Sequence, residues 1–175
     1  CSPVGRLTGV RPTDQERDWA VEALQALGKH AEGSGTIIAV EPLNRFETYF
    51  INTMEQSAQL LDRVNHPQVG VLYDTFHANI EEKNTFQAIQ TGGKHILHVH
   101  ISANDRGTPG EDHVDYAENV RGLKAIGYDG WLTIESFGSR IPELAAATCI
   151  WRTMAPSEEH VVREGVAFTR KIWAA

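Results

Sequence analysis

The hexapeptide TIIAVE at residues 36–41 is an apolar run that ends in a carboxylate, Glu41. It is apolar on both faces, which is typical of a parallel strand buried between two layers. Three later hydrophobic runs also end in a polar side chain: Asp74 follows residues 69–73, His100 follows 96–99 and Glu135 follows 131–134. The gaps between these four residues are 33, 26 and 35 positions, each about the length of one strand-plus-helix unit. We therefore expect the four side chains at the same end of four successive parallel strands.

Helical patterns separate the strands. Capping boxes, in which a threonine is followed three residues later by Glu or Gln, begin at Thr13 and Thr53. We expect the first helix to end at Gly33, and further helices near residues 84–90, through 116–123 and twice after the fourth strand. The residues expected in the core are Ala20, Leu24, Leu27 and Ala31 of the first helix, Val162, Val166, Thr169 and Trp173 of the last, and Trp19, Trp131 and Trp151.

This alternation repeats the βα unit four times after a leading helix, so we predict an α/β fold with a parallel sheet. A complete (β/α)8 TIM barrel needs about 250 residues, whereas this chain has 175. Four strands alone would leave two open sheet edges. We predict one domain over residues 1–175 with about four βα units of a TIM-barrel-type fold. It is either half of a longer protein or half of a dimer that closes the barrel in trans.

Composition excludes several classes of function. The net charge is −7 and no cluster of Lys and Arg exists, so a nucleic-acid partner is not expected. The chain has no apolar run of the roughly 18 residues that a membrane span needs. Its start, CSPVGR, does not resemble a signal peptide and reads like a chain entered midway. Cys1 and Cys149 lie far apart, and reduced thiols in a cytoplasmic protein are a simpler interpretation than one disulfide.

The four strand-end residues form a plausible metal-binding set. Three anions within about 4 Å repel one another by about 4 kcal/mol per pair at an effective dielectric constant of roughly 20, and a divalent cation would relieve this repulsion. Oxygen-rich sites favour Mg²⁺ or Mn²⁺, and the imidazole favours Mn²⁺ or Co²⁺. A structural zinc site is not expected because cysteine ligands are absent. Taken singly, each residue could instead be a helix cap or a surface residue.

Three more polar residues follow the same strands. Glu47 lies six residues beyond Glu41, His77 three beyond Asp74, and Arg106 six beyond His100. They could surround one pocket that binds a sugar or polyol. The alternatives are a surface ion pair that stabilises a turn for Arg106 and an exposed loop position for His77. His98 is expected to be a buried core histidine. No nucleophile elbow, P-loop, dinucleotide-binding loop or strand-end lysine is present.

Three segments closely resemble the D-tagatose 3-epimerase (ketose 3-epimerase) family of xylose isomerase-like TIM barrels. They are EPLNRFET at residues 41–48, DTFHANIEE at 74–82 and HVH at 98–100. WRTMAP at 151–156 and EGVAF at 164–168 resemble the C-terminal helices of that family. The similarity covers essentially the whole chain, aligned to the second half of such an enzyme, so the first three or four βα units are missing.

This resemblance implies a role for seven residues, each of the matching type. Glu41, Asp74, His100 and Glu135 would hold one divalent metal ion, with Mn²⁺ favoured and Mg²⁺ or Co²⁺ as alternatives. Glu47, His77 and Arg106 would hold the O1–O3 end of a ketose. The function implied is that of an isomerase, a metal-dependent ketose 3-epimerase that removes a proton at C3 and returns one to the opposite face through an enediolate.

Glu41 and Glu135 are expected to act as the acid–base pair of this reaction. Their strands are separated by two others, so the two carboxylates can approach C3 from opposite sides, each as base in one direction and acid in the other. No nucleotide or organic cofactor is predicted. The partners are expected to be the ketose and further copies of the chain, as a dimer or tetramer. The alternatives are a hydroxypyruvate isomerase, an inosose dehydratase or an inactive half-barrel.

Overall fold

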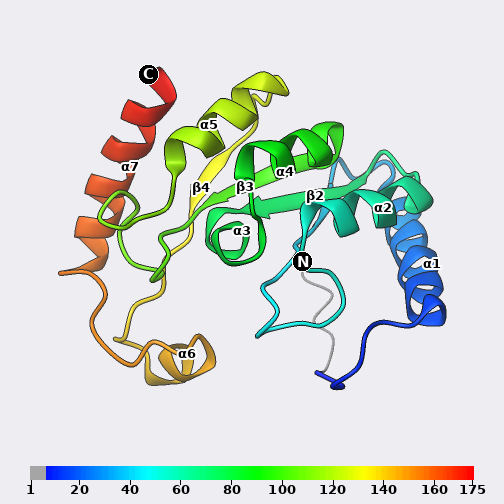
Figure 1. Ribbon diagram of the computed structural model, residues 1–175, viewed down its shortest axis with the longest axis horizontal. Helices are drawn as coiled ribbons and strands as arrows, with labels where there is room; N and C mark the ends of the chain where they lie inside the picture. The colour runs from blue at the N-terminus through cyan, green and yellow to red at the C-terminus, as the bar shows by residue number, and fades with distance from the viewer. Residues whose placement is uncertain (1–6) are drawn as a thin grey trace.

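The structure is a computed structural model that describes residues 7–175, and its centre is a parallel sheet (Figure 1). The strands are β1 (Ile38–Val40), β2 (Val69–Asp74), β3 (Ile96–Ile101) and β4 (Leu132–Ile134). They pair in the order β1-β2-β3-β4, every pair is parallel, and β1 and β4 form the two edges. The predicted α/β class with four strand-plus-helix units is therefore confirmed.

The helices form a second layer that follows the sheet in chain order. They are α1 (Asp14–Ala31), α2 (Met54–Val64), α3 (Thr75–Glu81), α4 (Thr85–Gly92), the 3-10 turn η1 (Gly93–His95), α5 (Tyr116–Ala125), α6 (Pro142–Ala147) and α7 (Glu158–Ala174). Neighbouring helices of the outer layer pack together, α1 on α2, α2 on α4, α4 on α5 and α5 on α7. Figure 1 shows that α6 stands apart from this layer, beyond the end of the sheet. No helix of residues 7–175 is long and apolar enough to cross a membrane.

The hydrophobic core lies between the sheet and these helices. Val71, Tyr73, Val99 and Ile101 are at most 1% exposed, and they occupy alternate positions in β2 and β3 because successive strand side chains point to opposite faces. The hydroxyl of Tyr73 donates to Oδ1 of Asn119 on α5 at 2.5 Å, so the buried polar tip is satisfied. Helix packing therefore covers one face of the sheet.

Both predicted capping boxes are present, and the buried face of α1 agrees with the predicted one at Leu24 and Ala31 but not at Leu27. Thr13 and Thr53 each accept from the backbone N–H three residues later, and the Glu or Gln there bonds back. Leu27 is 49% exposed, whereas Gly28 is buried. A Cβ atom on Gly28 would lie 2.6 Å from Nδ1 of His66. The glycine therefore lets α1 approach the start of β2 closely, at a position that apolar spacing did not identify.

The buried face of α7 agrees with the predicted stripe at Thr169 and Trp173 but not at Val162. Val161, Gly165 and Thr169 are buried, whereas Val162 is 63% exposed. A Cβ atom on Gly165 would lie 2.9 Å from the Cδ1 atom of Ile134. The close approach of α7 to β4 thus depends on a residue without a side chain.

The other face of the sheet is largely uncovered. Ile37 just before β1 is 50% exposed, and Trp131 just before β4 is 81% exposed. The expectation that Trp131 belongs to the core is wrong, as it is for Trp19 and Trp151, which are 60% and 75% exposed. Of the four tryptophans only Trp173 packs against the core. The described strands thus have one dry face and one open face, as expected of half a barrel.

Candidate active site

The carboxyl ends of the four strands bring four polar side chains together on the open face. One ligand atom from each of Glu41, Asp74, His100 and Glu135 lies within 4.8 Å of all the others. Strand register explains the cluster: Asp74 pairs with His100, and His100 pairs with Thr133, two residues before Glu135. A two-residue step returns to the same face of a strand. The structure therefore assembles the four residues that the sequence predicted at the strand ends.

Asp74 is the most buried member of the cluster, with 1% of its surface exposed. It is the N-cap of α3, and its Oδ1 accepts from the backbone N–H of Phe76 at 2.7 Å. Its Oδ2 accepts from Oγ of Ser102 and from Nη1 of Arg106, both at 3.2 Å. Capping and these two donors fix the carboxylate in one orientation, with Oδ2 also 3.4 Å from Nδ1 of His100.

Arg106 lies inside the cluster and not on a solvated turn. It is 7% exposed, so the alternative of a surface ion pair is wrong. Its Nη1 contacts the carboxylates of Asp74 and Glu135, and its guanidinium lies 3.7 Å from the centre of the Phe76 ring. Arginine suits this position because its planar group can pair with carboxylates and stack on an aromatic ring at once.

The backbone of Arg106 adopts a left-handed conformation, with φ at +64°. Its N–H donates to the carbonyl of Ala103 at 3.0 Å, and its own carbonyl accepts from Oγ of Ser136 at 2.7 Å and from N–H of Phe137 at 3.0 Å. Non-glycine residues in this region cost free energy and concentrate at functional sites. Hydrogen bonds from the segment after Glu135 thus hold the backbone of the loop that contains Arg106.

His77 lies on α3 and not in the exposed loop considered from sequence. The helix begins directly after Asp74 and was not predicted, and it buries His77 to 2% exposure. Nδ1 of His77 accepts from the backbone N–H of Asn44 at 3.0 Å, while Nε2 lies 3.7 Å from Oε1 of Glu41 and 3.1 Å from Nη2 of Arg106. Burial lowers the pKa of His77, which favours a neutral imidazole.

Glu47 lies at the surface of the loop after β1, and its carboxylate accepts from Nδ2 of Asn44 at 2.8 Å. Asn44 itself is 2% exposed and was not among the predicted site residues. Its position three residues after a strand-end carboxylate was the available signal. The structure therefore places all three predicted pocket residues around the cluster, with Asn44 joining Glu47 to His77.

Burial and neighbouring charges shift the pKa values of the cluster residues in different directions. Burial, reinforced by the charges of Asp74 and Glu135, raises the pKa of Glu41 to about 7. Burial opposes the ionisation of Asp74, but the imidazole of His100, 3.4 Å away, and the charge of Arg106 outweigh it and lower that pKa to about 2. Burial alone would lower the pKa of His100, yet the neighbouring carboxylates raise it to about 9. Neighbouring groups whose pKa values are shifted this strongly are typical of functional sites.

The donor set fits one divalent metal ion. Three carboxylates and one imidazole converge, and Nδ1 of His100 is buried without a hydrogen bond, 3.4 Å from an oxygen of Asp74 and of Glu135. Mostly oxygen ligands with a single imidazole suit Mn²⁺, Mg²⁺ or Co²⁺ better than a structural zinc ion. Arg106 and protonated His100 offset part of the negative charge from within the protein.

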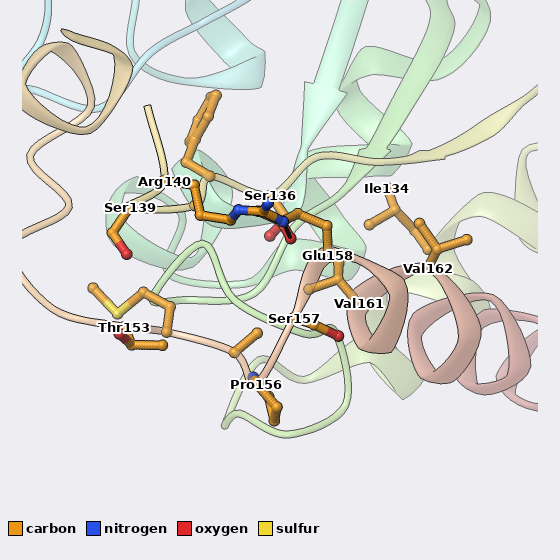
Figure 2. Close-up of a pocket in the computed structure, with 14 residues that line it drawn as sticks. Ile134, Ser136, Ser139, Arg140, Thr153, Pro156, Ser157, Glu158, Val161 and Val162 are labelled. Atoms are coloured by element: carbon orange, nitrogen blue, oxygen red, sulfur yellow. Dashed lines mark hydrogen bonds and ion pairs between the residues drawn. The ribbon is translucent and has the colours of Figure 1, made fainter. Parts of the chain in front are cut away.

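A cavity of about 430 Å³ adjoins the cluster but does not contain it (Figure 2). It lies between the segment after β4 and the start of α7, where Arg140 reaches across to Glu158 at 2.9 Å. Ile134 faces this cavity, whereas Glu135, the next residue, faces the cluster. The described residues thus leave the cluster on an open sheet face, which explains why the cavity forms elsewhere.

Two expectations near the site need correction. His98 is only half-buried, with Nε2 at 3.1 Å from Oγ1 of Thr133, because the face that it shares with His100 is uncovered. Cys149 lies beyond the end of α6 with φ at +58°, not in a helix, and its exposed thiol has no disulfide partner among residues 7–175. Cys1 lies outside the described residues, so the pairing of the two cysteines stays untested.

Comparison with known proteins gives one matching family and several sugar epimerases that this chain resembles. The model of a family described as xylose isomerase-like TIM barrel matches residues 2–172. A probable ketose 3-epimerase of Synechocystis sp. is 41% identical over 98% of this chain and 60% of its own length. The crystal structure of D-allulose 3-epimerase from Methylomonas sp. superposes with a TM-score of 0.90 at 32% identity, over 97% of this chain and 59% of that one.

A further solved structure, D-psicose 3-epimerase with D-tagatose from Clostridium cellulolyticum H10, gives a TM-score of 0.89 at 30% identity. It is covered over 61% of its length, and this chain over 97%. The chain therefore spans about 60% of the length of these relatives.

Proposed function

Because the chain belongs to the xylose isomerase-like TIM barrel family, we propose that the protein is a metal-dependent ketose 3-epimerase. One observation carries this proposal: ligand atoms of Glu41, Asp74, His100 and Glu135 converge within 4.8 Å. The relatives named as ketose and D-allulose 3-epimerases support the substrate class.

Glu41, Asp74, His100 and Glu135 would hold one divalent ion, with Mn²⁺ favoured and Mg²⁺ or Co²⁺ as alternatives. When bound, the ion supplies Lewis-acid polarisation of the ketose oxygens, which makes the neighbouring C–H bond acidic. The protein holds its part of the site in place through Ser102 and the backbone of Phe76, both bonded to Asp74.

Glu41 and Glu135 are proposed to exchange the proton at C3. They follow the two edge strands, β1 and β4, and so approach the cluster from opposite sides. One carboxylate takes the proton from C3 while the C–H electron pair moves toward C2 and the carbonyl becomes an enediolate. The other carboxylate then delivers a proton to the opposite face of C3, and the carbonyl re-forms with inverted configuration.

His77, Arg106 and Glu47 are proposed to hold the O1–O3 end of the ketose. His77 and Arg106 lie beside Glu41 and Glu135 and can donate to the oxygen on which negative charge develops. Glu47 can accept a hydrogen bond from a sugar hydroxyl. Phe76 and Phe137 flank the guanidinium of Arg106 and restrict its orientation.

Four further βα units are proposed to close the barrel over the open face. The described sheet has four strands, whereas a barrel has eight, and the matched relatives are longer than this chain. The side chains of those units would contact the far end of the sugar and so decide which ketose is preferred. Whether they belong to the same polypeptide or to a second copy is decided by the size of the gene product.

Hydrogen exchange tests the proposed chemistry directly. Purified gene product is incubated with Mn²⁺ and a panel of ketohexoses in deuterated water, and deuterium at C3 is followed by NMR. We expect C3 exchange with epimerisation in the wild type and its loss in both Glu41→Gln and Glu135→Gln. Persistence of exchange in both variants would overturn the acid–base assignment. Turnover of hydroxypyruvate or inosose without any ketose would overturn the reaction class.

A further inference from the structure

Asn44 connects two of the residues proposed to hold the ketose. It lies in the loop after β1, is 2% exposed, and is 33 positions from His77 in the sequence. Its side-chain Nδ2 lies 2.8 Å from Oε1 of Glu47 and 3.0 Å from Nδ1 of His77. A buried amide is costly unless its donors and acceptor are satisfied, so contacts to two site residues are informative.

The orientation of the Asn44 amide follows from a third contact. Its Oδ1 lies 3.0 Å from the backbone nitrogen of Phe46, and a backbone N–H can only donate. The oxygen must therefore face Phe46, which turns the NH₂ group toward Glu47 and His77. Oδ1 thus stabilises the turn of the loop, while Nδ2 contacts Glu47 and His77.

The backbone of Asn44 fixes the tautomer of His77. Its N–H lies 3.0 Å from Nδ1 of His77 and must donate to it, so Nδ1 carries a lone pair. A neutral imidazole in this position has its proton on Nε2. That atom lies 3.7 Å from Oε1 of Glu41, toward which its proton can point, whereas its 3.1 Å contact with Nη2 of Arg106 brings two donors together and is not a hydrogen bond.

We propose that Asn44 is a positioning residue that fixes the Glu47 carboxylate and the His77 imidazole in the orientation that binds the ketose. This inference rests on the proposed function, because the orientation of these two side chains matters for activity only if a ketose binds to them. It adds to the site a residue that acts through two side chains proposed to hold the sugar.

Two substitutions separate this role from simple support of the loop. Asn44→Asp keeps the oxygen that accepts from Phe46 and so keeps the turn, but it replaces the NH₂ donor with an oxygen that faces the Glu47 carboxylate. Asn44→Ala removes both functions. We expect kcat/KM for the ketose to fall roughly 10- to 100-fold in Asn44→Ala and at least as far in Asn44→Asp. If the turn alone mattered, Asn44→Asp would keep wild-type kcat/KM, and that result overturns the proposal.

Mn²⁺ affinity is the second readout of the same variants. It should change less than about threefold, because the side-chain contacts of Asn44 go to Glu47, His77 and the backbone of Phe46. General damage to the loop after Glu41 would instead lower the metal affinity of both variants together with kcat/KM, and would overturn the positioning role. Asn84→Ala is the matched control, because it removes an amide that caps α4 away from the site and should leave kcat/KM unchanged.

The tautomer is a readout that does not depend on turnover. In protein labelled with ¹⁵N-histidine, the His77 signals, assigned with His77→Gln, should show Nδ1 without a proton and Nε2 with one. A proton on Nδ1 would overturn the proposed orientation. An active wild type with a fully active Asn44→Asp variant overturns this proposal alone, whereas a wild type that epimerises no ketose overturns the proposed function and this proposal with it.

Discussion

The two faces of the sheet differ in what they bury and therefore in what they do. On the helix-covered face, Val71, Val99 and Ile101 are fully buried, and apolar burial of this kind is the main source of folding free energy. On the open face, carboxylates and an imidazole gather within 4.8 Å, while Trp131 remains 81% exposed. One face of the sheet contributes the hydrophobic core, and the other carries the cluster of polar side chains.

Burying the polar cluster lowers the stability of the fold, and the apolar burial on the helix-covered face has to compensate for this loss. A buried carboxylate such as Asp74 needs a paired charge to remain ionised, and even well-paired buried ions add little net stability. Arg106 and His100 supply that charge here. A sequence selected for stability alone would place apolar residues at these strand ends, so their presence indicates function.

The largest effect is expected where a charge is removed from the open face. Asp74→Asn keeps the N-cap oxygen for Phe76 but leaves Arg106 and His100 with one carboxylate fewer. We expect Mn²⁺ affinity to fall at least roughly 100-fold and kcat/KM at least roughly 1,000-fold, measured by calorimetry and by C3 exchange. Asp62→Asn is the control, since Asp62 is a 70% exposed carboxylate paired with His95. Equal losses in both variants would contradict the assignment.

On the helix-covered face the same comparison predicts a loss of stability without a loss of chemistry. Ile89 on α4 is 0% exposed, and its replacement by alanine should lower the free energy of unfolding by about 2–5 kcal/mol. Mn²⁺ affinity of the folded protein should not change. Ile141→Ala, at a 58% exposed position, should change stability by less than about 0.5 kcal/mol. Denaturant titration gives both values, and similar values would contradict the assignment of the core.

The division between the faces also explains what the sequence could predict. The strand ends could be predicted because the runs before them are mostly apolar, so Glu41, Asp74 and Glu135 stand out as the carboxylates that follow these runs. Capping boxes at Thr13 and Thr53 were readable because they depend on local hydrogen bonds. These features fix the order of the elements and the place where the polar side chains meet.

Features that depend on close packing could not be predicted from the sequence. Gly28 and Gly165 let α1 and α7 approach their neighbours closely because they lack a side chain, whereas spacing rules count apolar residues. Helix α3 follows Asp74 without a loop, so His77 was assigned to a loop. Asn44 was missed because its importance arises from a contact with a histidine 33 positions away, which one sequence does not reveal.

The pKa values of the open face predict how metal-free stability depends on pH. The pKa values of Glu41 and His100 are raised to about 7 and about 9, so both groups bind a proton more tightly in the folded state. Their contribution is complete below the unfolded pKa and is lost as pH rises through the folded one. Asp74 has the opposite sign, because its pKa is lowered to about 2, and its contribution is lost only in acid.

Metal-free protein should therefore be less stable at about pH 8.5 than at about pH 5.5, by on the order of 1–2 kcal/mol once solvent screening of these partly exposed groups is allowed for. Metal binding needs Glu41 and His100 deprotonated, so the rise in Tm on adding Mn²⁺ should be larger at the higher pH. Thermal unfolding with Mn²⁺ or with a chelator measures both trends. A larger Mn²⁺ effect at the lower pH would contradict the pKa assignments.

The smallest effect is expected at Trp131, and it tests whether the open face stays open in solution. Trp131 is 81% exposed, so in the 175-residue chain Trp131→Ala should change the free energy of unfolding by less than about 0.5 kcal/mol. Trp173→Ala should cost about 1–3 kcal/mol, because Trp173 packs against the core. A cost for Trp131→Ala that equals that of Trp173→Ala, and that grows with protein concentration, would mean that a second copy covers the face. Sedimentation of the same samples would then show a dimer, and the contrast between the two faces would hold only for the separated chain.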